Sequence, residues 1–187
     1  MSKYILFILA NLSSLFVSAQ DVNLDALKLW NVQKEDIVNL PINKGITVIL
    51  FTSTDCPYDQ LYEDRIFALQ KKYGGKADFF MINANTPSNT GDNSTKTKAQ
   101  AKQYNIPYFI DQNLDAVRVF QIEKSPEAVV LTTKNGNTTM VYHGAIDDNP
   151  QSENNVRVKY LESVLNNVIQ NKTSPYDFKR AAGCRIR

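Results

Sequence analysis

Two cysteines, Cys56 and Cys184, carry the side chains of this sequence that are best suited to redox chemistry. They are the only cysteines among its 187 residues, so the chain can form a single intramolecular disulfide. One disulfide is too few for a small scaffold held together by such bonds, and the two cysteines form no grouping typical of a zinc site.

Cys56 lies where a strand is expected to end and a helix to begin. The run from Ile46 to Phe51 is apolar and rich in β-branched residues, which is typical of a strand buried on both faces. Residues 52–55 (Thr-Ser-Thr-Asp) are good helix caps, and Pro57 suits a first helical turn.

This position favours the ionised form of the Cys56 thiol. Free backbone N–H groups and the positive end of the helix dipole lower the pKa of a thiol there, while the charge of Asp55 works against the shift. A thiolate attacks disulfides and peroxides, so we predict that Cys56 is redox-active. The alternative is a small, inert core cysteine.

Cys184 lies in a C-terminal segment, residues 173–187, that has no clear periodicity. The segment is long enough to fold back over the domain and reach Cys56. Three interpretations stay open: a thiol that resolves oxidised Cys56, a static disulfide with Cys56, or a free cysteine in the tail.

The elements around Cys56 alternate between strands and helices, which predicts an α/β fold with a central sheet and helices on both faces. Lys134-Asn135-Gly136 indicates a hairpin near the end. The expected strands are 46–51, 77–83, 108–110, 127–133 and 138–142, and the expected helices are 57–73, 95–104, 114–120 and one around 161–168.

The N-terminal segment differs from the rest of the chain. Lys3 precedes an apolar stretch, and Val17-Ser18-Ala19 has the small residues of a signal peptidase site. We therefore expect a signal peptide at 1–19, a domain at 20–172, a tail at 173–187, and a periplasmic or secreted protein. The alternative is an uncleaved anchor or a buried helix.

Charge and metal-ligating residues exclude several function classes. The net charge of +2 is too small to indicate a nucleic-acid or membrane partner. His143 is the only histidine, which argues against a copper or other metal site. We expect no cofactor.

Several motifs together resemble the peroxiredoxin-like group of thioredoxin-family, redoxin-domain proteins. They occur in the same order as in that group and span almost the whole chain after residue 19. The motifs are Cys56-Pro57-Tyr58 with Tyr62-Glu63-Asp64-Arg65-Ile66, Ile82-Asn83-Ala84-Asn85, Tyr142 to Asn149 (YHGAIDDN), and Gly183-Cys184-Arg185-Ile186.

The resemblance implies a thioredoxin fold, with a mixed sheet and an inserted strand and helix, and a redox-active Cys56. It implies an antioxidant thiol peroxidase or a thiol–disulfide oxidoreductase, recharged by an external thiol reductant such as a thioredoxin-like protein. Ser53, three positions before the cysteine, corresponds to a hydroxyl that donates to a bound peroxide or to the thiolate; helix capping explains it equally well. Pro126 corresponds to a cis-proline that faces the thiol, or is an ordinary proline at a strand entry.

The sequence also departs from the pattern of the group. Asp59 stands where a thioredoxin has the second cysteine of C-x-x-C, and Ile49 stands where a peroxiredoxin has a proline. Arg65 and Arg118 are the candidates for an arginine in a peroxide pocket. Two function classes follow: a thiol oxidoreductase, or a non-catalytic binding module with a structural disulfide.

Overall fold

A computed structural model of the chain describes residues 20–24, 27–43, 45–84 and 91–186. The expected signal peptide at 1–19 lies outside the described residues. Within the described residues, nine strands form one mixed sheet with the order β1-β9-β8-β4-β5-β6-β2-β3, and β10 pairs with β9. These strands are β1 (Gln20–Asp21), β2 (Lys28–Asn31), β3 (Asp36–Asn39), β4 (Gly45–Thr52), β5 (Asp78–Asn83), β6 (Tyr108–Ile110), β8 (Glu127–Lys134), β9 (Asn137–Gly144) and β10 (Phe178–Lys179).

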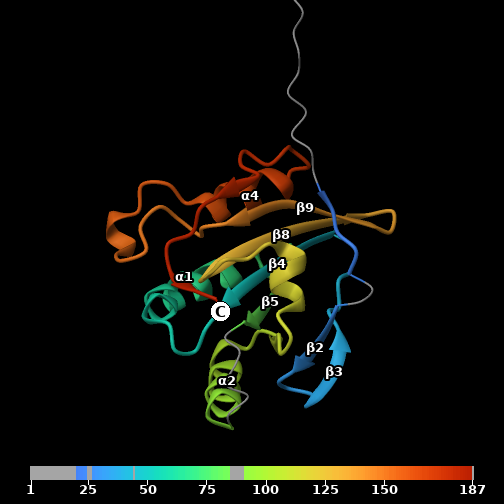
Figure 1. Cartoon of the computed structure of the whole chain (residues 1–187). Helices are drawn as coiled ribbons and strands as arrows, with labels where there is room; N and C mark the ends of the chain where they lie inside the picture. Colours follow the sequence, from blue (N-terminus) through green and yellow to red (C-terminus); the bar gives the residue numbers. More distant parts are fainter. Residues whose placement is uncertain (1–19, 25–26, 44, 85–90, 187) are drawn as a thin grey trace, which may run out of the picture.

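The centre of the sheet is the apolar strand β4. It runs parallel to β5 and antiparallel to β8, and β5 runs parallel to β6. The hairpin between β8 and β9 turns at Asn135 and Gly136, whose φ angles of 53° and 85° are the positive values that a tight hairpin of this kind needs. The expected α/β fold with a mixed central sheet is confirmed (Figure 1).

Helices cover both faces of the sheet, because alternate residues of β4 point to opposite sides. Val48 and Leu50 pack in a core with α1, α2 and α4, whereas Ile49 and Phe51 pack in a second core with α3. The helices are α1 (Pro57–Tyr73), α2 (Gly91–Tyr104), α3 (Asp115–Phe120) and α4 (Tyr160–Val168), and a 3-10 turn, η1, spans Glu153–Asn155.

Two parts of the sheet depart from the expectations. The segment before residue 45 forms the β2–β3 hairpin, whose turn places Glu35 at a φ of 55°. The C-terminal tail forms β10 and β11 (Cys184–Arg185), and β11 pairs with β7 (Lys124–Ser125) in a separate two-stranded sheet. In Figure 1 the red tail runs from α4 down to the end of β4. The tail is therefore a docked part of the domain.

None of the helices in the described segments combines the length and the apolar character that crossing a membrane requires.

Candidate redox site at the start of helix α1

Cys56 lies at the start of α1, as the sequence predicts; it is itself the N-cap residue, in place of the residues 52–55 that were expected to cap the helix, and its side chain makes no capping hydrogen bond. Its backbone is extended, with φ −89° and ψ 118°, and Pro57 opens the helix. The Cys56 N–H donates to the carbonyl of Ser53 at 3.2 Å, and the Cys56 carbonyl accepts from the N–H of Asp59 at 3.1 Å. The side chain lies in the core and is 1% exposed.

Cys56 is joined to Cys184 by a disulfide. The S–S distance is 2.04 Å and the two Cα atoms lie 5.9 Å apart, across 128 positions of sequence. The interpretation of Cys184 as a free cysteine is therefore wrong. The other two, a resolving thiol and a static disulfide, both fit this bond.

The tail reaches the sulfur by adding a strand beside β7. Cys184 pairs with Ser125 in antiparallel register, and the N–H of Ile186 donates to the carbonyl of Glu123 at 3.0 Å. Gly183 permits this approach, because a Cβ atom there would lie 2.0 Å from the carbonyl oxygen of Ser125. The glycine of the terminal motif thus has a steric role.

Pro126 directly follows β7 and is buried, and the Ser125–Pro126 peptide bond is cis. The expected cis-proline is confirmed. The carbonyl oxygen of Ser125 lies 3.5 Å from the Cys56 Sγ. A disulfide sulfur carries no proton, so this is a contact in the oxidised form and becomes a hydrogen-bond acceptor for the thiol after reduction.

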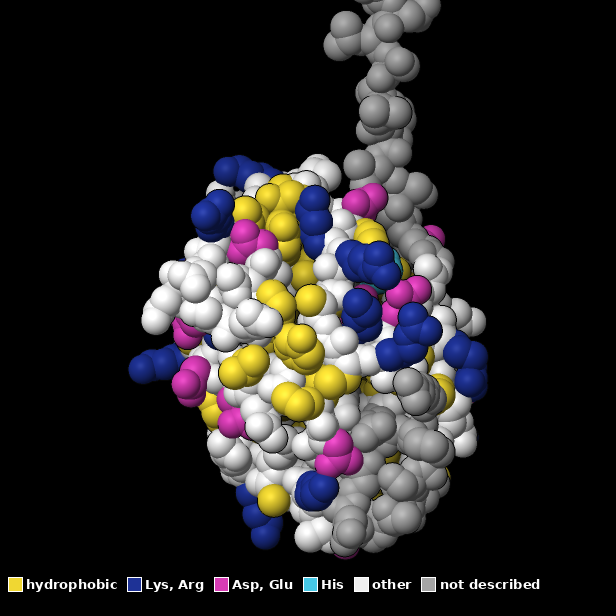
Figure 2. Space-filling view, turned by 60° about the vertical axis from the view of Figure 1, so that its left-hand side comes forward, with side chains coloured by type: hydrophobic (Ala, Val, Ile, Leu, Met, Phe, Trp, Pro, Cys, Tyr) yellow, Lys and Arg dark blue, Asp and Glu magenta, His cyan; other side chains and the backbone are white. Residues whose placement is uncertain are grey.

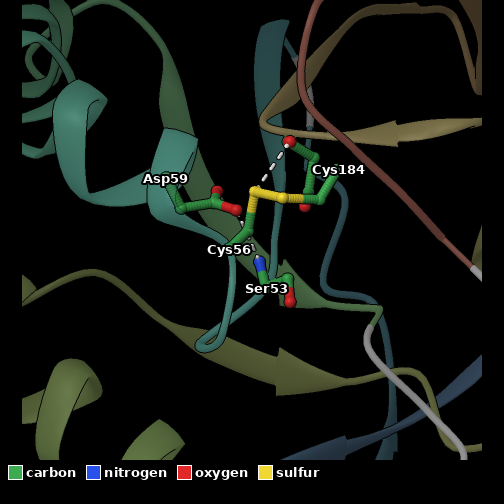
Figure 3. The surroundings of a disulfide bond; sticks show 5 residues. Ser53, Cys56, Asp59 and Cys184 are labelled. Carbon is green, nitrogen blue, oxygen red and sulfur yellow. Dashed lines mark hydrogen bonds between the residues drawn. A yellow bond between two sulfur atoms is a disulfide. The ribbon is translucent and has the colours of Figure 1, made fainter.

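Asp59 places a carboxyl group beside the disulfide, one helical turn after Cys56. Figure 3 shows this group pointing toward the Cys56 sulfur, and its Oδ2 accepts from the N–H of Ser53 at 3.1 Å. Burial raises the pKa of Asp59 to about 8; the nearby Ser125 hydroxyl and the Ser53 N–H offset this only partly, and the charge of Glu63 adds to it. The carboxyl group is therefore mostly protonated at neutral pH.

Ser53 contacts the site through its backbone. Its N–H binds Asp59 and its carbonyl accepts from Cys56, and the residue is 7% exposed. Ser53 thereby links the cysteine to the carboxyl group. The expected role of its hydroxyl toward a peroxide or a thiolate stays a prediction.

A buried polar cluster joins two of the sequence motifs. Asp147 accepts from the Tyr62 hydroxyl and from Arg65 Nη1, each at 2.8 Å, and Arg65 also donates to the carbonyl of Asn149 at 2.7 Å. The guanidinium carbon of Arg65 lies 4.1 Å from the centre of the Tyr62 ring. The cluster ties α1 to the loop after β9. Asp147 Oδ1 also accepts from the backbone N–H of Asn149 at 3.0 Å, so the same carboxylate caps the loop.

The cluster also accounts for one of the two arginines proposed for a peroxide pocket. Arg65 is engaged by Asp147, and Arg118 pairs with Asp115 on the exposed surface of α3. The spacing of Tyr62 and Arg65, three residues apart on one helix face, was the available signal for a shared partner.

His143 lies on β9 beside the tail. Its ring is 4.7 Å from that of Phe178, and its Nδ1 is 3.8 Å from Glu127 Oε1. In the described part of the chain, no three metal-ligating side chains gather in a group that could hold an ion.

The comparison with protein families decides the family of the chain. A family model described as a thioredoxin-like domain matches residues 33–153, which is more than half of the sequence. The chain belongs to the thioredoxin-like family. The matched region contains Cys56, Asp59 and Pro126, whereas Cys184 and the tail lie beyond it.

Solved structures support the same fold. An uncharacterized conserved protein from Geobacillus kaustophilus is 22% identical with a TM-score of 0.74, over 90% of this chain and 89% of that one. A hypothetical protein from Sinorhizobium meliloti 1021 is 20% identical with a TM-score of 0.73, over 90% and 91%. An uncharacterized thioredoxin-like protein from Porphyromonas gingivalis is 18% identical with a TM-score of 0.51, over 79% and 88%. Among curated proteins, none matches the sequence significantly.

Proposed function

We propose that this protein is a thiol–disulfide oxidoreductase that cycles between the Cys56–Cys184 disulfide and the two thiols. The observation that carries the proposal is the disulfide between a cysteine that opens a helix and a cysteine on a short, added tail strand. The helix start stabilises a Cys56 thiolate as a leaving group. Asp59 occupies the position of the second cysteine in a C-x-x-C motif, so the tail supplies the second thiol instead.

The exposure of the two cysteines favours one direction of attack. Cys56 is 1% exposed, whereas Cys184 is partly exposed. An incoming thiolate therefore attacks the Cys184 sulfur, and Cys56 leaves as the thiolate at the helix start. The better-stabilised thiolate is the better leaving group.

The surroundings of Cys56 favour a disulfide over a peroxide as the oxidised substrate. Peroxide reduction of the peroxiredoxin-like, antioxidant kind benefits from a cation near the sulfur, and both arginines considered for that role pair with carboxylates elsewhere. Asp59 instead brings an acidic group to Cys56.

The reductant that we propose is an external dithiol protein, such as another thioredoxin-like protein, and we propose that the chain works after export to the periplasm or the medium. Pro57 and Leu61 expose apolar side chains on the first turns of α1, and Leu61 is 48% exposed. Figure 2 shows apolar side chains gathered across the middle of one face of the molecule. Such a surface suits brief contact with another protein.

The burial of Cys56 also favours a second candidate function. A sulfur that is 1% exposed suits a binding module in which the disulfide merely fastens the tail. In that case the disulfide resists mild reductants while the protein stays folded.

Two reactions of the reduced protein test the proposal. Reduced protein is mixed with a peptide disulfide or with hydrogen peroxide, and free thiols are counted over time. We expect rapid mixed disulfides with the peptide, return of the Cys56–Cys184 bond, and slow reaction with peroxide. Fast thiol loss with peroxide would assign a peroxidase, and no reaction with either would support the binding module. Cys56→Ser is the matched control.

A further inference from the structure

Asp59 is a buried carboxyl group without an ion-pair partner in the part of the chain that the structure describes. It is 6% exposed, and the ion pairs of the described residues do not include it. Its Oδ2 accepts from the N–H of Ser53, while its Oδ1 and the Oγ of Ser125 are both buried; in the described part of the structure the two groups lie close enough for the hydroxyl to lower the pKa of Asp59, but neither atom has a partner with hydrogen-bond geometry. Burying a polar atom without a hydrogen-bond partner costs free energy, so a function of the Asp59 carboxyl group would explain why it is placed here.

The first turn of α1 sets the position of this carboxyl group relative to the sulfur. Cys56 caps the helix, and the N–H of Asp59 donates to the Cys56 carbonyl at 3.1 Å. The carboxyl group points toward the Cys56 sulfur (Figure 3), while the carbonyl of Ser125 lies 3.5 Å from the same sulfur. The sulfur therefore lies beside a hydrogen-bond acceptor, the Ser125 carbonyl, and beside a carboxyl group that can give or take a proton.

The groups that face Asp59 from the neighbouring elements are neutral or acidic. Glu63 lies on the same helix, and its charge raises the pKa of Asp59. Burial raises the pKa of Tyr104 on α2 and of Tyr108 on β6, and the negative charge of a nearby Asp59 carboxylate raises it further. Because no cation among the described residues pairs with this carboxyl group, it can exchange a proton near neutral pH.

We propose that Asp59 passes a proton to and from the Sγ of Cys56 during disulfide exchange. The inference rests on the proposed function, because it needs a Cys56 that alternates between disulfide and thiol. The pKa of about 8 supports it, since a proton carrier works best when its pKa lies near the working pH.

A thiolate of the external dithiol attacks the Cys184 Sγ; the S–S bond breaks and a mixed disulfide forms at Cys184. The electron pair stays on Cys56, and the Asp59 carboxyl proton passes to that thiolate, leaving a carboxylate. The second thiol of the reductant loses its proton to water and attacks the mixed disulfide as a thiolate; Cys184 leaves as a thiolate that takes a proton from water, and the Asp59 carboxylate regains its proton from water. The dithiol is oxidised and the Cys56–Cys184 bond is reduced. In the reverse direction, the Asp59 carboxylate takes the Cys56 proton.

A purely structural role of Asp59 would require a hydrogen-bond acceptor but no transferable proton. The hydrogen bond from the Ser53 N–H needs only an acceptor, which the amide oxygen of asparagine also supplies. Asp59→Asn therefore keeps this hydrogen bond and removes the transferable proton.

The test is the rate at which dithiothreitol reduces the native disulfide between pH 6 and pH 10, divided by the fraction of dithiothreitol that is ionised. We expect this corrected rate to fall about tenfold or more in the native protein as Asp59 loses its proton. In Asp59→Asn the corrected rate should be lower than in the native protein at pH 6 and should not change with pH. Asp55→Asn is the matched control: it makes the same substitution next to Cys56 at an exposed site paired with Lys96, and its corrected rate, whatever its absolute value, should fall with pH as in the native protein.

A second, equilibrium measurement follows the same proton exchange between Asp59 and Cys56. In Cys184→Ser, the ultraviolet absorbance of the Cys56 thiolate is followed against pH, with and without Asp59→Asn. We expect two coupled steps with Asp59 present, and one step at least one pH unit lower without it. Identical titrations, or a native reduction profile that is flat on its own, would overturn the role of Asp59. A disulfide that dithiothreitol cannot reduce in any folded variant would instead overturn the proposed function, and this inference with it.

Discussion

Replacing Asp59 with asparagine should change how the stability of the oxidised protein depends on pH. The native carboxyl group is 6% exposed, and burial raises its pKa from 3.8 to about 8. The folded state therefore binds this proton more tightly than the unfolded state does. Between about pH 4 and pH 8, the contribution of Asp59 to the free energy of unfolding must fall as the pH rises.

The size of the effect follows from the shift. One proton difference corresponds to about 1.4 kcal/mol per pH unit, so the contribution of Asp59 falls by about 3 kcal/mol between pH 5 and pH 7. Asp59→Asn lacks this dependence. Its free energy of unfolding relative to the native protein should therefore rise by about the same amount over this range, whatever the fixed cost of its unpaired amide N–H group.

Urea unfolding of the oxidised proteins at several pH values measures this difference. Groups that titrate identically in both proteins cancel when the two curves are subtracted. Asp55→Asn is the control, because the Asp55 side chain is 50% exposed and paired with Lys96, and its curve should run parallel to that of the native protein. A constant difference between native protein and Asp59→Asn from pH 5 to pH 7 would refute the reasoning about this buried carboxyl group.

Two further substitutions test how the tail and α1 are held. Gly183→Ala places a Cβ atom 2.0 Å from the Ser125 carbonyl oxygen, so β11 must shift; we expect a cost of roughly 1–3 kcal/mol to the oxidised form and about tenfold easier reduction by dithiothreitol. Gly75→Ala, where no atom lies within 4 Å, should leave reduction unchanged, and equal reduction of both variants would contradict the steric role of Gly183. Arg65→Met leaves Asp147 buried and without its charge partner, which should lower the free energy of unfolding in urea by about 3–5 kcal/mol. Arg118→Met breaks an exposed pair and should cost at most about 1 kcal/mol; similar losses in the two arginine variants would count against a buried cluster.

Local signals predicted the elements around the site closely. Pro57 in the first turn and Gly74 after the last turn place α1 at Pro57–Tyr73, the range expected from the sequence. The apolar run of β4 and the Asn135-Gly136 turn predicted the sheet centre and its hairpin in the same way. In these segments, local propensity and tertiary packing favour the same structure.

The parts that the sequence did not predict depend on contacts between distant segments. The β2–β3 turn lacks an Asn-Gly or Asp-Gly pair, and β7 and β11 are two residues each, so neither has a readable period. These short strands form because the tail docks on residues 123–125.

The candidate site shows the same division. The sequence predicted the thiol at the helix start, and the resemblance implied the cis-proline before β8. The sequence also showed that Asp59 replaces the second cysteine of C-x-x-C. It did not predict that the Asp59 side chain is buried or that it points toward the sulfur, because both depend on how β6, β7 and α2 pack around it. The pairing of Arg65 with Asp147 is likewise visible only once α1 and the loop after β9 are placed together.

The most direct test of a reversible Cys56–Cys184 bond is its redox equilibrium in the folded protein. The protein is equilibrated in dithiothreitol or glutathione buffers of stepped potential, its free thiols are alkylated, and the reduced fraction is counted by mass spectrometry. We expect a single two-electron transition above about −270 mV, in the range of thioredoxin-type catalysts, with the fold retained on both sides. A bond that stays oxidised below about −300 mV, or opens only when the protein unfolds, would contradict the proposed cycle.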